Sequence, residues 1–463
     1  MGATVEVDIV IRGGTVVTAD SRFQADIGIR GERVVQIGGD LTGTREIDAN
    51  GHFVLPGAID AHVHLTSDEP DPAAIQWADD FTSGSEAALA GGITTVGNMT
   101  FLRAGESILA GLEREAQIAR EQSIADVILH PVISEPRQAI LDEIDQLLDA
   151  GHSDIKFFMS TPSFDSRTHG FLAATEAAGR NGLLTMIHCE DYPILRWSID
   201  KLLAEGRRSL SNYPASRPII SEVVATQRAV AFAEVTGAPV YIVHLSSEAA
   251  LDVCRDAQAR GVPVYVETRP LYLHLTSERF LEPDGAKYVG QPPLREESDR
   301  VALWDGLRSG AINTICTDHA PWTLEHKLDP ELHVGNLRPG VENLQTMLPM
   351  LYDEGVRGGK ITLEQLVALT STNVAKLFGL YPRKGTIAVG ADADLILWNP
   401  DERRVIRDED MLSRAGHSVY SGTEVTGWPS MTIRRGEIVY ENGRVTGAAG
   451  SGELLRRGQS RGL

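Results

Sequence analysis

The 463-residue sequence is poor in cysteine and has no long apolar run. Its three cysteines, Cys189, Cys254 and Cys316, form no CxxC pair and are too few for a disulfide framework. No apolar stretch approaches the roughly 20 residues of a transmembrane helix. The first residues lack the basic and apolar regions of a secretory signal, and no GxxxxGK[ST] phosphate loop occurs. These absences predict a cytoplasmic protein without a membrane segment.

Positive charge is also scarce. The chain has 43 lysine and arginine residues against 64 aspartate and glutamate residues, a formal net charge of −21. Nucleic acids and anionic membranes attract basic surfaces, so this balance speaks against both as partners. The composition is otherwise that of a globular protein, and the length suits a large α/β barrel with an appended domain.

Two regions of short alternating strands lie at opposite ends of the chain. Residues 1–55 contain VDIVIRGGTVV and ERVVQIGG, and residues 385–450 contain ADADLILW and MTIRRGEIVYENG. Apolar and polar positions that alternate between glycines predict antiparallel strands. We therefore expect one small β-sandwich domain built from both termini. The glycine-rich, basic residues 451–463 are expected to form a loose tail or to reach a neighbouring subunit.

The middle of the chain, residues 56–384, alternates apolar runs with amphipathic segments of helix length. LAGLEREAQIAREQ and SEAALDVCRDAQARG are two of the helical patterns. Near-continuous apolar strands are typical of parallel sheets that are covered on both faces. Eight strand–helix units predict the α/β class and a (β/α)8, or TIM, barrel. The predicted strands lie within residues 57–65, 91–99, 126–133, 153–160, 183–190, 238–246, 262–270 and 312–320.

Polar residues recur near the C-terminal ends of these predicted strands, where the active sites of TIM barrels lie. His62 and His64 are two residues apart, so both side chains point to one face of their strand. Imidazoles with a carboxylate suit a borderline divalent metal, above all Zn²⁺. Each residue alone has a plainer role, such as a core histidine or a helix cap, but together they predict a metal centre. The set is His62, His64, Lys156, His188, His244 and Asp318.

Lys156 stands out in this set because it lies in the apolar segment SDIKFFMS. Burying an unpaired ammonium is costly, so the stem could carry the charge to water or a distant carboxylate could pair with it. A third interpretation is that burial lowers the pKa of the amine, which then captures CO₂ as a carbamate. An anionic carbamate would bridge two divalent metal ions in a binuclear site.

Several motifs resemble those of the amidohydrolase superfamily, specifically its dihydropyrimidinase/hydantoinase branch, over nearly the whole chain. They include PGAIDAHVHL, GGITTV, IKFFM, IHCED, QPPLR, TDHAPW and NVAKLFGLYPRKGTIAVGADADL. The resemblance implies that His62 and His64 hold one metal ion together with Asp318. It implies that His188 and His244 hold the second.

The resemblance further implies a hydrolase of cyclic amides. N6-carboxylysine at Lys156 would bridge the metal ions, and a hydroxide shared by them would attack a hydantoin, a dihydropyrimidine or a related cyclic ureide or imide. Asp318 would be the general base that takes the proton and returns it to the leaving nitrogen. A homo-oligomer, dimer or tetramer, is also expected.

Three positions are predicted to contact the substrate. Gln291, ahead of PPLR, and Asn336, in GNLRPG, match the family positions that grip it. Thr161 stands where many hydantoinases have a tyrosine that hydrogen-bonds the developing oxyanion. Arg269, in ETRPLYL, is a further departure. The pocket therefore departs from the family pattern more than the metal ligands do.

Other functions stay open at this point. Related allantoinases also lack the tyrosine, which keeps allantoin as an alternative substrate. Dihydroorotate suits the sequence less well, because Leu65, Thr66 and Ser67 stand where dihydroorotases have an arginine. A non-catalytic scaffold of the same fold is opposed by the six filled ligand positions. A mononuclear deaminase on the same barrel is opposed by Lys156.

Overall fold

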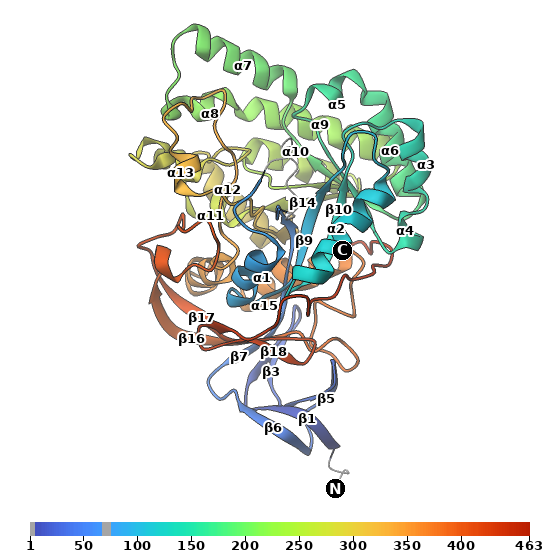
Figure 1. The fold of residues 1–463 in the computed structure, drawn as a ribbon, viewed down its shortest axis with the longest axis vertical. Coiled ribbons are helices and arrows are strands. Elements are labelled where there is room, and N and C mark those ends of the chain that lie inside the picture. Colours follow the sequence, from blue (N-terminus) through green and yellow to red (C-terminus); the bar gives the residue numbers. More distant parts are fainter. Residues whose placement is uncertain (1–4, 67–75) are drawn as a thin grey trace.

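The computed structural model describes residues 5–66 and 76–463, and their strands form three sheets. An eight-stranded sheet lies at the centre of a ring of helices, as Figure 1 shows. The other two sheets lie together beyond one end of that ring, at the bottom of the same view. The chain therefore has a barrel part and a β part.

The β part contains strands from both ends of the chain. Its four-stranded sheet has the order β5 (Arg33–Ile37), β4 (Ile27–Arg30), β1 (Val5–Arg12) and β6 (Leu41–Asp48). Its seven-stranded sheet has the order β19 (Arg444–Val445), β18 (Glu437–Glu441), β17 (Glu424–Arg434), β16 (Leu395–Val405), β7 (Phe53–Pro56), β2 (Thr15–Val17) and β3 (Arg22–Gln24). Ile29 and Val34 of the first sheet share one apolar core with Val54 and Leu395 of the second. The predicted sandwich built from both termini is confirmed.

The eight predicted barrel strands are all present, and each pairs in parallel with the next along the chain. A parallel bridge between Val63 and His319 joins the first strand to the segment after the last and closes the barrel. The strands are β8 (Ala58–Val63), β9 (Ile93–Phe101), β10 (Asp126–Val132), β11 (Asp154–Phe158), β12 (Leu184–His188), β13 (Val240–Ile242), β14 (Val264–Thr268) and β15 (Thr314–Ile315).

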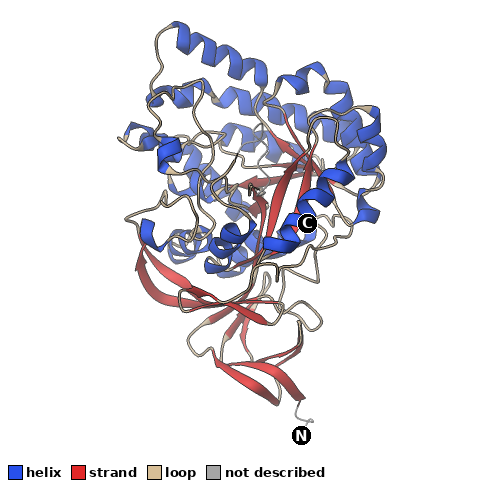
Figure 2. Cartoon of the chain, viewed as in Figure 1, coloured by secondary structure: helices blue, strands red, loops and turns tan. Residues whose placement is uncertain are grey.

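Helices surround the barrel strands, as the blue ribbons of Figure 2 show. In α2, Ser107 caps the first turn by accepting a hydrogen bond from Ala110, and the buried Leu112, Ala116 and Ala119 recur at helical spacing. No helix of the described residues is both long and apolar enough to cross a membrane. The longer helices are α1 (Phe81–Ala90), α2 (Ile108–Gln122), α3 (Gln138–Ile144), α6 (Thr168–Arg180), α7 (Tyr192–Ala204), α9 (Ile219–Thr236), α10 (Glu248–Ala259) and α12 (Glu297–Ser309). The shorter helices are α4 (Leu147–Ala150), α5 (Pro162–Ser166), α8 (Tyr213–Ser216), α11 (Pro270–His274), α13 (Leu324–Lys327), α14 (Met347–Met350), α15 (Leu363–Val367) and α16 (Asn373–Leu377).

The C-terminal residues pack against the barrel, so the expectation of a loose tail is wrong. Val127 donates its backbone N–H to Glu453 at 2.8 Å and accepts from Leu455 at 2.9 Å. The guanidinium of Arg457 is buried and pairs with Asp154, which opens β11. Glycine-rich composition suggested mobility, but backbone hydrogen bonds and this buried ion pair hold the segment in place.

Candidate metal centre

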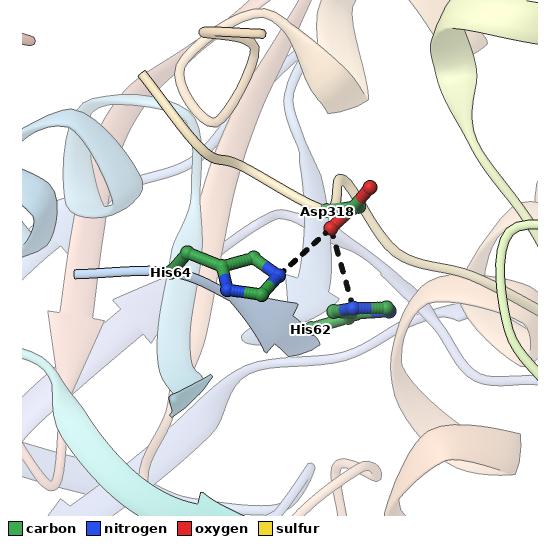
Figure 3. A group of neighbouring side chains, drawn as sticks. All are labelled: His62, His64 and Asp318. Carbon is green, nitrogen blue, oxygen red and sulfur yellow. Dashed lines mark hydrogen bonds and ion pairs between the residues drawn. The ribbon is translucent and has the colours of Figure 1, made fainter. Parts of the chain in front are cut away.

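Three of the predicted ligands converge at the C-terminal end of the barrel (Figure 3). His62 lies in β8, His64 follows that strand, and Asp318 follows β15. Asp318 Oδ1 is 3.2 Å from His62 Nε2 and 3.1 Å from His64 Nε2. One potential ligand atom from each of the three residues lies within 4.8 Å of the others. All three side chains are buried, so the cluster is not a chance surface grouping.

His188 and His244 form a second pair beside this cluster. His188 Nδ1 is 3.0 Å from His244 Nε2, and the ring centroids of His62 and His244 are 5.5 Å apart. Burial lowers the pKa of both His188 and His244. The neutral imidazole is the form that binds a metal ion, so the barrel interior holds these two side chains in the ligating state.

Lys156 belongs to the same group of side chains. It lies in β11, is fully buried, and its Nζ has no hydrogen-bond partner among the described residues. Burial lowers the pKa of Lys156 to about 8. Burial is the main cause of the lowered pKa values of His62 and His188, and the positive charge of Lys156 lowers them further. The interpretations in which its stem reaches water or a carboxylate pairs with it are therefore wrong.

Two of the converging residues have a backbone conformation that is unusual for residues other than glycine. His244 has φ 41° and Asp318 has φ 49°, both in the left-handed region. Such residues cost of order 1–3 kcal/mol each and cluster at functional sites, where the surrounding structure imposes them. Each lies just after a barrel strand, and the turn directs its side chain into the barrel mouth.

Glu267, which lies in none of the predicted ligand positions, accepts hydrogen bonds from two of the histidines. Its Oε1 accepts hydrogen bonds from Nδ1 of His62 and from the backbone N–H of His244, both at 2.9 Å. Tyr241 donates to Oε2 of the same carboxylate at 2.9 Å. Because Nδ1–H of His62 donates a hydrogen bond to Glu267, Nε2 of the neutral ring carries a lone pair, and this lone pair faces Asp318. A carboxylate within the apolar strand VPVYVETRP was the signal for this residue.

Glu190 plays the corresponding part for His188. Its Oε2 lies 2.8 Å from His188 Nε2, and Arg217 donates Nε–H to its other oxygen at 2.9 Å. Burial opposes ionisation of Glu190, but Arg217 and His188 outweigh it and lower the carboxyl pKa to about 2. His188 therefore presents Nδ1, its bare nitrogen, to the barrel mouth.

Arg269 contacts Asp318 from the other side. Its Nη1 is 3.0 Å from Asp318 Oδ2, and its Nε–H donates to the carbonyl of Thr317 at 3.0 Å. Burial opposes ionisation of Asp318, but Arg269 and His62 hold the pKa of that carboxyl well below its usual range. The two oxygens of Asp318 thus have different surroundings: Oδ1 faces the histidines and Oδ2 faces the guanidinium.

A cavity of 340 Å³ opens above the histidines and Asp318. Its wall is largely apolar and includes Trp77, Phe101 and Phe158, whose rings lie near the histidines. The rings of Phe101 and Phe158 are stacked, with centroids 6.1 Å apart. The cavity suits a small planar molecule with an apolar substituent.

The structure brings two of the three predicted substrate contacts to this cavity. Thr161 and Gln291 line it. Asn336 does not: it is exposed, and its side-chain oxygen accepts from the backbone N–H of His333 at 2.6 Å. The predicted contact of Asn336 therefore has no support in this geometry, because the side chain closes its own loop. Pro339 and Gly340, a few residues later, line the cavity instead.

The donor set fits divalent metal ions. Nε2 atoms of His62 and His64 lie 3.1–3.2 Å from Asp318 Oδ1, and ring nitrogens of His188 and His244 lie 3.0 Å apart. The lone pairs of His62 Nε2 and Asp318 Oδ1 repel each other at this distance unless a cation lies between them. Carboxylates accept from the far nitrogens of His62 and His188, as they do in metal sites.

Comparison with known proteins agrees with this geometry. The sequence profile of the amidohydrolase family matches residues 53–439, and the chain belongs to that family. It is 37% identical over 458 residues to a D-hydantoinase from Rhizobium radiobacter, covering 97% of this chain and 99% of the relative. It is 35% identical over 457 residues to a D-hydantoinase from Geobacillus stearothermophilus, covering 97% and 96%.

Solved structures give the same result. A dihydropyrimidinase from Brevibacillus agri matches with a TM-score of 0.93 and 35% identity, covering 97% of this chain and 98% of that one. An L-hydantoinase (dihydropyrimidinase) from Arthrobacter aurescens matches with a TM-score of 0.90 and 30% identity, covering 97% and 100%. The chain is therefore an enzyme of the amidohydrolase family with the hydantoinase-type TIM barrel.

Proposed function

We propose that the protein is a binuclear metal-dependent cyclic amidohydrolase that opens the ring C–N bond of a hydantoin, a dihydropyrimidine or a related cyclic ureide or imide. The observation that carries the proposal is the convergence of two histidine groups and Asp318 around the buried, unpartnered amine of Lys156. Full-length relatedness to proteins named D-hydantoinase supports this choice of substrate class.

Five side chains would hold the two metal ions directly. His62, His64 and Asp318 would bind one ion, and His188 and His244 would bind the other. When bound, the two divalent cations, for which we favour Zn²⁺, supply Lewis acidity that acidifies water and polarises the ring carbonyl.

Lys156 would join the site as N6-carboxylysine. Its neutral amine forms a bond from nitrogen to the carbon of CO₂ and loses a proton, which gives a carbamate with two ligand oxygens. A pKa of about 8 leaves part of the amine neutral near pH 7, whereas an ordinary lysine is almost fully protonated there. The carbamate replaces a buried cation by an anion that the two cations neutralise.

Asp318 is the proton carrier of the proposed reaction. It accepts a proton from the water that adds to the ring carbonyl and returns that proton to the ring nitrogen as the C–N bond breaks. The products are a carboxylate and a freed ureide or amide. Arg269 keeps Asp318 ionised before the reaction, so the carboxylate is ready to accept.

Thr161 and the aromatic wall would select the substrate. The hydroxyl of Thr161 donates a hydrogen bond to the carbonyl of Phe158 at 3.2 Å. The threonine side chain is shorter by an aromatic ring than the tyrosine that many hydantoinases have at this position. The volume that a tyrosine would fill is left to a ring substituent, which the aromatic rings of the wall would contact. Allantoin, a ureide with a polar substituent, is the second candidate.

An assay of substrate preference tests the proposal. Protein loaded with Zn²⁺ in bicarbonate buffer is offered aryl- and alkyl-substituted hydantoins, dihydrouracil, allantoin and cyclic imides, and ring opening is followed by chromatography. We expect bicarbonate-dependent turnover with the highest kcat/KM on a substituted hydantoin. A maximum on allantoin would select the second candidate. Ammonia release from cytosine, or no turnover on any ring, would overturn the proposal.

The cytoplasmic location and the dimeric or tetrameric assembly expected from the sequence belong to the same proposal. Cell fractionation tests the first, and light scattering coupled to gel filtration tests the second.

A further inference from the structure

Lys327 is a buried lysine that lies outside the proposed metal centre. It ends α13, and its side chain reaches inward so that the residue is only 2% exposed. Its Nζ donates to three backbone carbonyls: Val289 at 2.8 Å, Arg338 at 2.8 Å and Gly340 at 2.7 Å. Burial and the charge of Arg269 lower the pKa of Lys327. The cage of three main-chain oxygens opposes this effect, because only the protonated amine can donate to all three.

Each N–H group of the protonated Lys327 side chain has a hydrogen-bond acceptor in this cage. A protonated lysine has three N–H groups and no acceptor, and here each group has one carbonyl partner. No carboxylate forms an ion pair with it in the part of the chain that the structure describes. Lys327 therefore does not neutralise a buried acid, and its function lies in what its three partners share.

Those three carbonyls belong to two loops that form one wall of the cavity. Val289 lies two residues before Gln291, which lines the cavity, and Arg338 directly precedes Pro339 and Gly340, which also line it. The loops touch each other directly as well, since Gly340 donates its N–H to Val289 at 2.9 Å. Lys327 lies behind this wall and ties the two loops together.

The same wall is joined to the segment that carries Asp318. Ala320, two residues after Asp318, donates its N–H to Val341 at 3.1 Å. The fit is tight, because Gly340 has φ +125° and a Cβ there would lie 2.2 Å from the carbonyl oxygen of Ala320. A shift of the 338–341 loop would therefore change the separation between the substrate wall and Asp318.

We propose that Lys327 is a positioning residue for the substrate: its ammonium fixes the two loops that carry Gln291, Pro339 and Gly340 at the distance from Asp318 that the ring of a cyclic amide requires. This inference rests on the proposed cyclic-amide activity. Lys327 does not touch the substrate, and it acts only through the carbonyls it holds.

Replacing the ammonium by an apolar group tests the inference. Lys327→Met keeps the length of the side chain but removes the three donors. We expect KM to rise about 10-fold while kcat changes less than about 3-fold, because the loops orient the substrate and the metal ligands are untouched. Zinc content per chain should equal that of the wild type. A purely structural lysine would lower the folded fraction and leave KM unchanged.

Two further variants separate geometry from charge. Lys327→Arg keeps a cation, but a planar guanidinium cannot send three N–H groups to one converging cage, so KM should rise as well. This variant also carries the test if Lys327→Met does not fold. Lys287→Met is the matched control: it removes a lysine of the same loop region that pairs with Asp284 at 2.7 Å and holds no cavity carbonyl. Its KM should stay at the wild-type value.

Chemical rescue gives a sharper test. Lys327→Ala leaves the three carbonyls facing a space that ammonium ion can enter, and ammonium presents the same N–H donors. We expect ammonium chloride to lower the KM of Lys327→Ala at least about 3-fold relative to sodium chloride at equal ionic strength, and to leave the wild type unchanged. If the KM of Lys327→Ala were the same in ammonium chloride as in sodium chloride, the proposed role of the three N–H donors would be contradicted.

Hydrogen–deuterium exchange separates failure of this inference from failure of the proposed activity. In Lys327→Met the amides of residues 285–292 and 338–342 should exchange faster than in the wild type and in Lys287→Met, whatever the substrate is. If the wild type opens no cyclic amide but these loops lose protection, only the activity is wrong. If KM and loop protection are both unchanged in a folded Lys327→Met protein, the inference is overturned.

Discussion

Two buried lysines at opposite ends of the barrel have contrasting surroundings. Lys384 lies at the base, where its ammonium is 2.5 Å from Asp126, 2.6 Å from Asp394 and 3.1 Å from Asp392. Asp126 is the first residue of β10, and Lys156 pairs with the last residue of that strand, at the mouth. Lys156 is as deeply buried, but among the described residues its Nζ has no hydrogen-bond partner and only the ring of Phe158 beside it.

The two environments have opposite effects on the two amines. Burial disfavours the charge of both, but Asp394 and Asp126 outweigh it at Lys384 and raise its pKa, whereas burial prevails at Lys156 and lowers its pKa to about 8. Lys384 is thus a cation that joins barrel and β part, while Lys156 has the lowered pKa that the proposed carbamate requires. Glu267 and Asp318 also act on Lys156, but neither forms an ion pair with it, so burial prevails there.

The largest expected effect comes from removing the reactive amine. Lys156→Ala should abolish turnover and lower bound metal, because the proposed bridging anion would be lost and the two cations would repel each other. Lys156→Arg should do the same, since a guanidinium stays protonated and cannot form a carbamate. Turnover and metal analysis of both proteins check this. A fully active Lys156→Arg protein with two metal ions would exclude the carbamate.

Asp318→Asn should separate the two functions of that side chain. The amide oxygen still offers a weak ligand, but it cannot carry a proton. We expect turnover to fall about 10²-fold or more while metal content falls only modestly. Steady-state kinetics on the same samples as the metal analysis measure both. A strictly proportional loss of turnover and metal would remove the support for the proton-carrier role.

Lys384→Met should give the converse result at the base of the barrel. It leaves the buried Asp394 without its cation, while Asp126 keeps Arg435 and Asp392 keeps Arg383. Removing one partner of a buried ion pair costs about 3–5 kcal/mol of unfolding free energy. Denaturant unfolding measures the loss. We expect kcat/KM and metal content per folded chain to stay within about 2-fold of the wild type. Loss of metal at unchanged stability would contradict the separation of the two ends.

Thr161→Tyr should change the choice of substrate at the mouth. A tyrosine restores a donor to the oxyanion and fills the space left to a ring substituent, and one such donor is worth about 3 kcal/mol in the transition state. We expect the ratio of kcat/KM for a small dihydropyrimidine over an aryl hydantoin to rise several-fold. An unchanged ratio in a folded, metal-loaded protein would show that Thr161 does not contact the substrate.

The smallest effect is expected from His152, a partly buried histidine whose Nδ1 has no hydrogen-bond partner among the described residues. Burial lowers its pKa to about 4 from an unfolded value near 6.5, so between these values the unfolded state binds more protons and stability falls as pH falls. His152→Leu removes this loss, which after screening is about 1 kcal/mol at pH 5. Unfolding at pH 5 and pH 7.5 measures it. Turnover should not change, because His152 lies away from the mouth; a loss of turnover would contradict this.

Much of the fold was predictable because its signals are local. Eight apolar segments alternate with helical patterns, and alternating strands occur at both ends, so the barrel and the β-sandwich follow from periodicity along the chain. The tail was not predictable in this way. Glycine and basic residues at 451–463 suggested mobility, yet Arg457 pairs with Asp154 more than three hundred residues away in sequence.

The sequence by itself determined which side chains meet at the mouth of the barrel. Parallel strands bring their C-terminal ends to one edge, so His62, His188, His244 and Asp318 converge once the barrel is assigned. Which oxygen or nitrogen faces which partner was decided only by the tertiary structure. Hydrogen bonds of 2.8–3.1 Å depend on side-chain directions that the spacing of residues does not encode.

Tertiary structure alone also decided how the three buried lysines differ. Lys156, Lys384 and Lys327 each lie among apolar or mixed neighbours in the sequence, and nothing local distinguishes them. Within the described residues Lys156 has no hydrogen-bond partner, Lys384 has three carboxylates and Lys327 has three backbone carbonyls. The free energy of a buried charge depends on the groups within a few ångströms of it, and these groups come from distant parts of the chain.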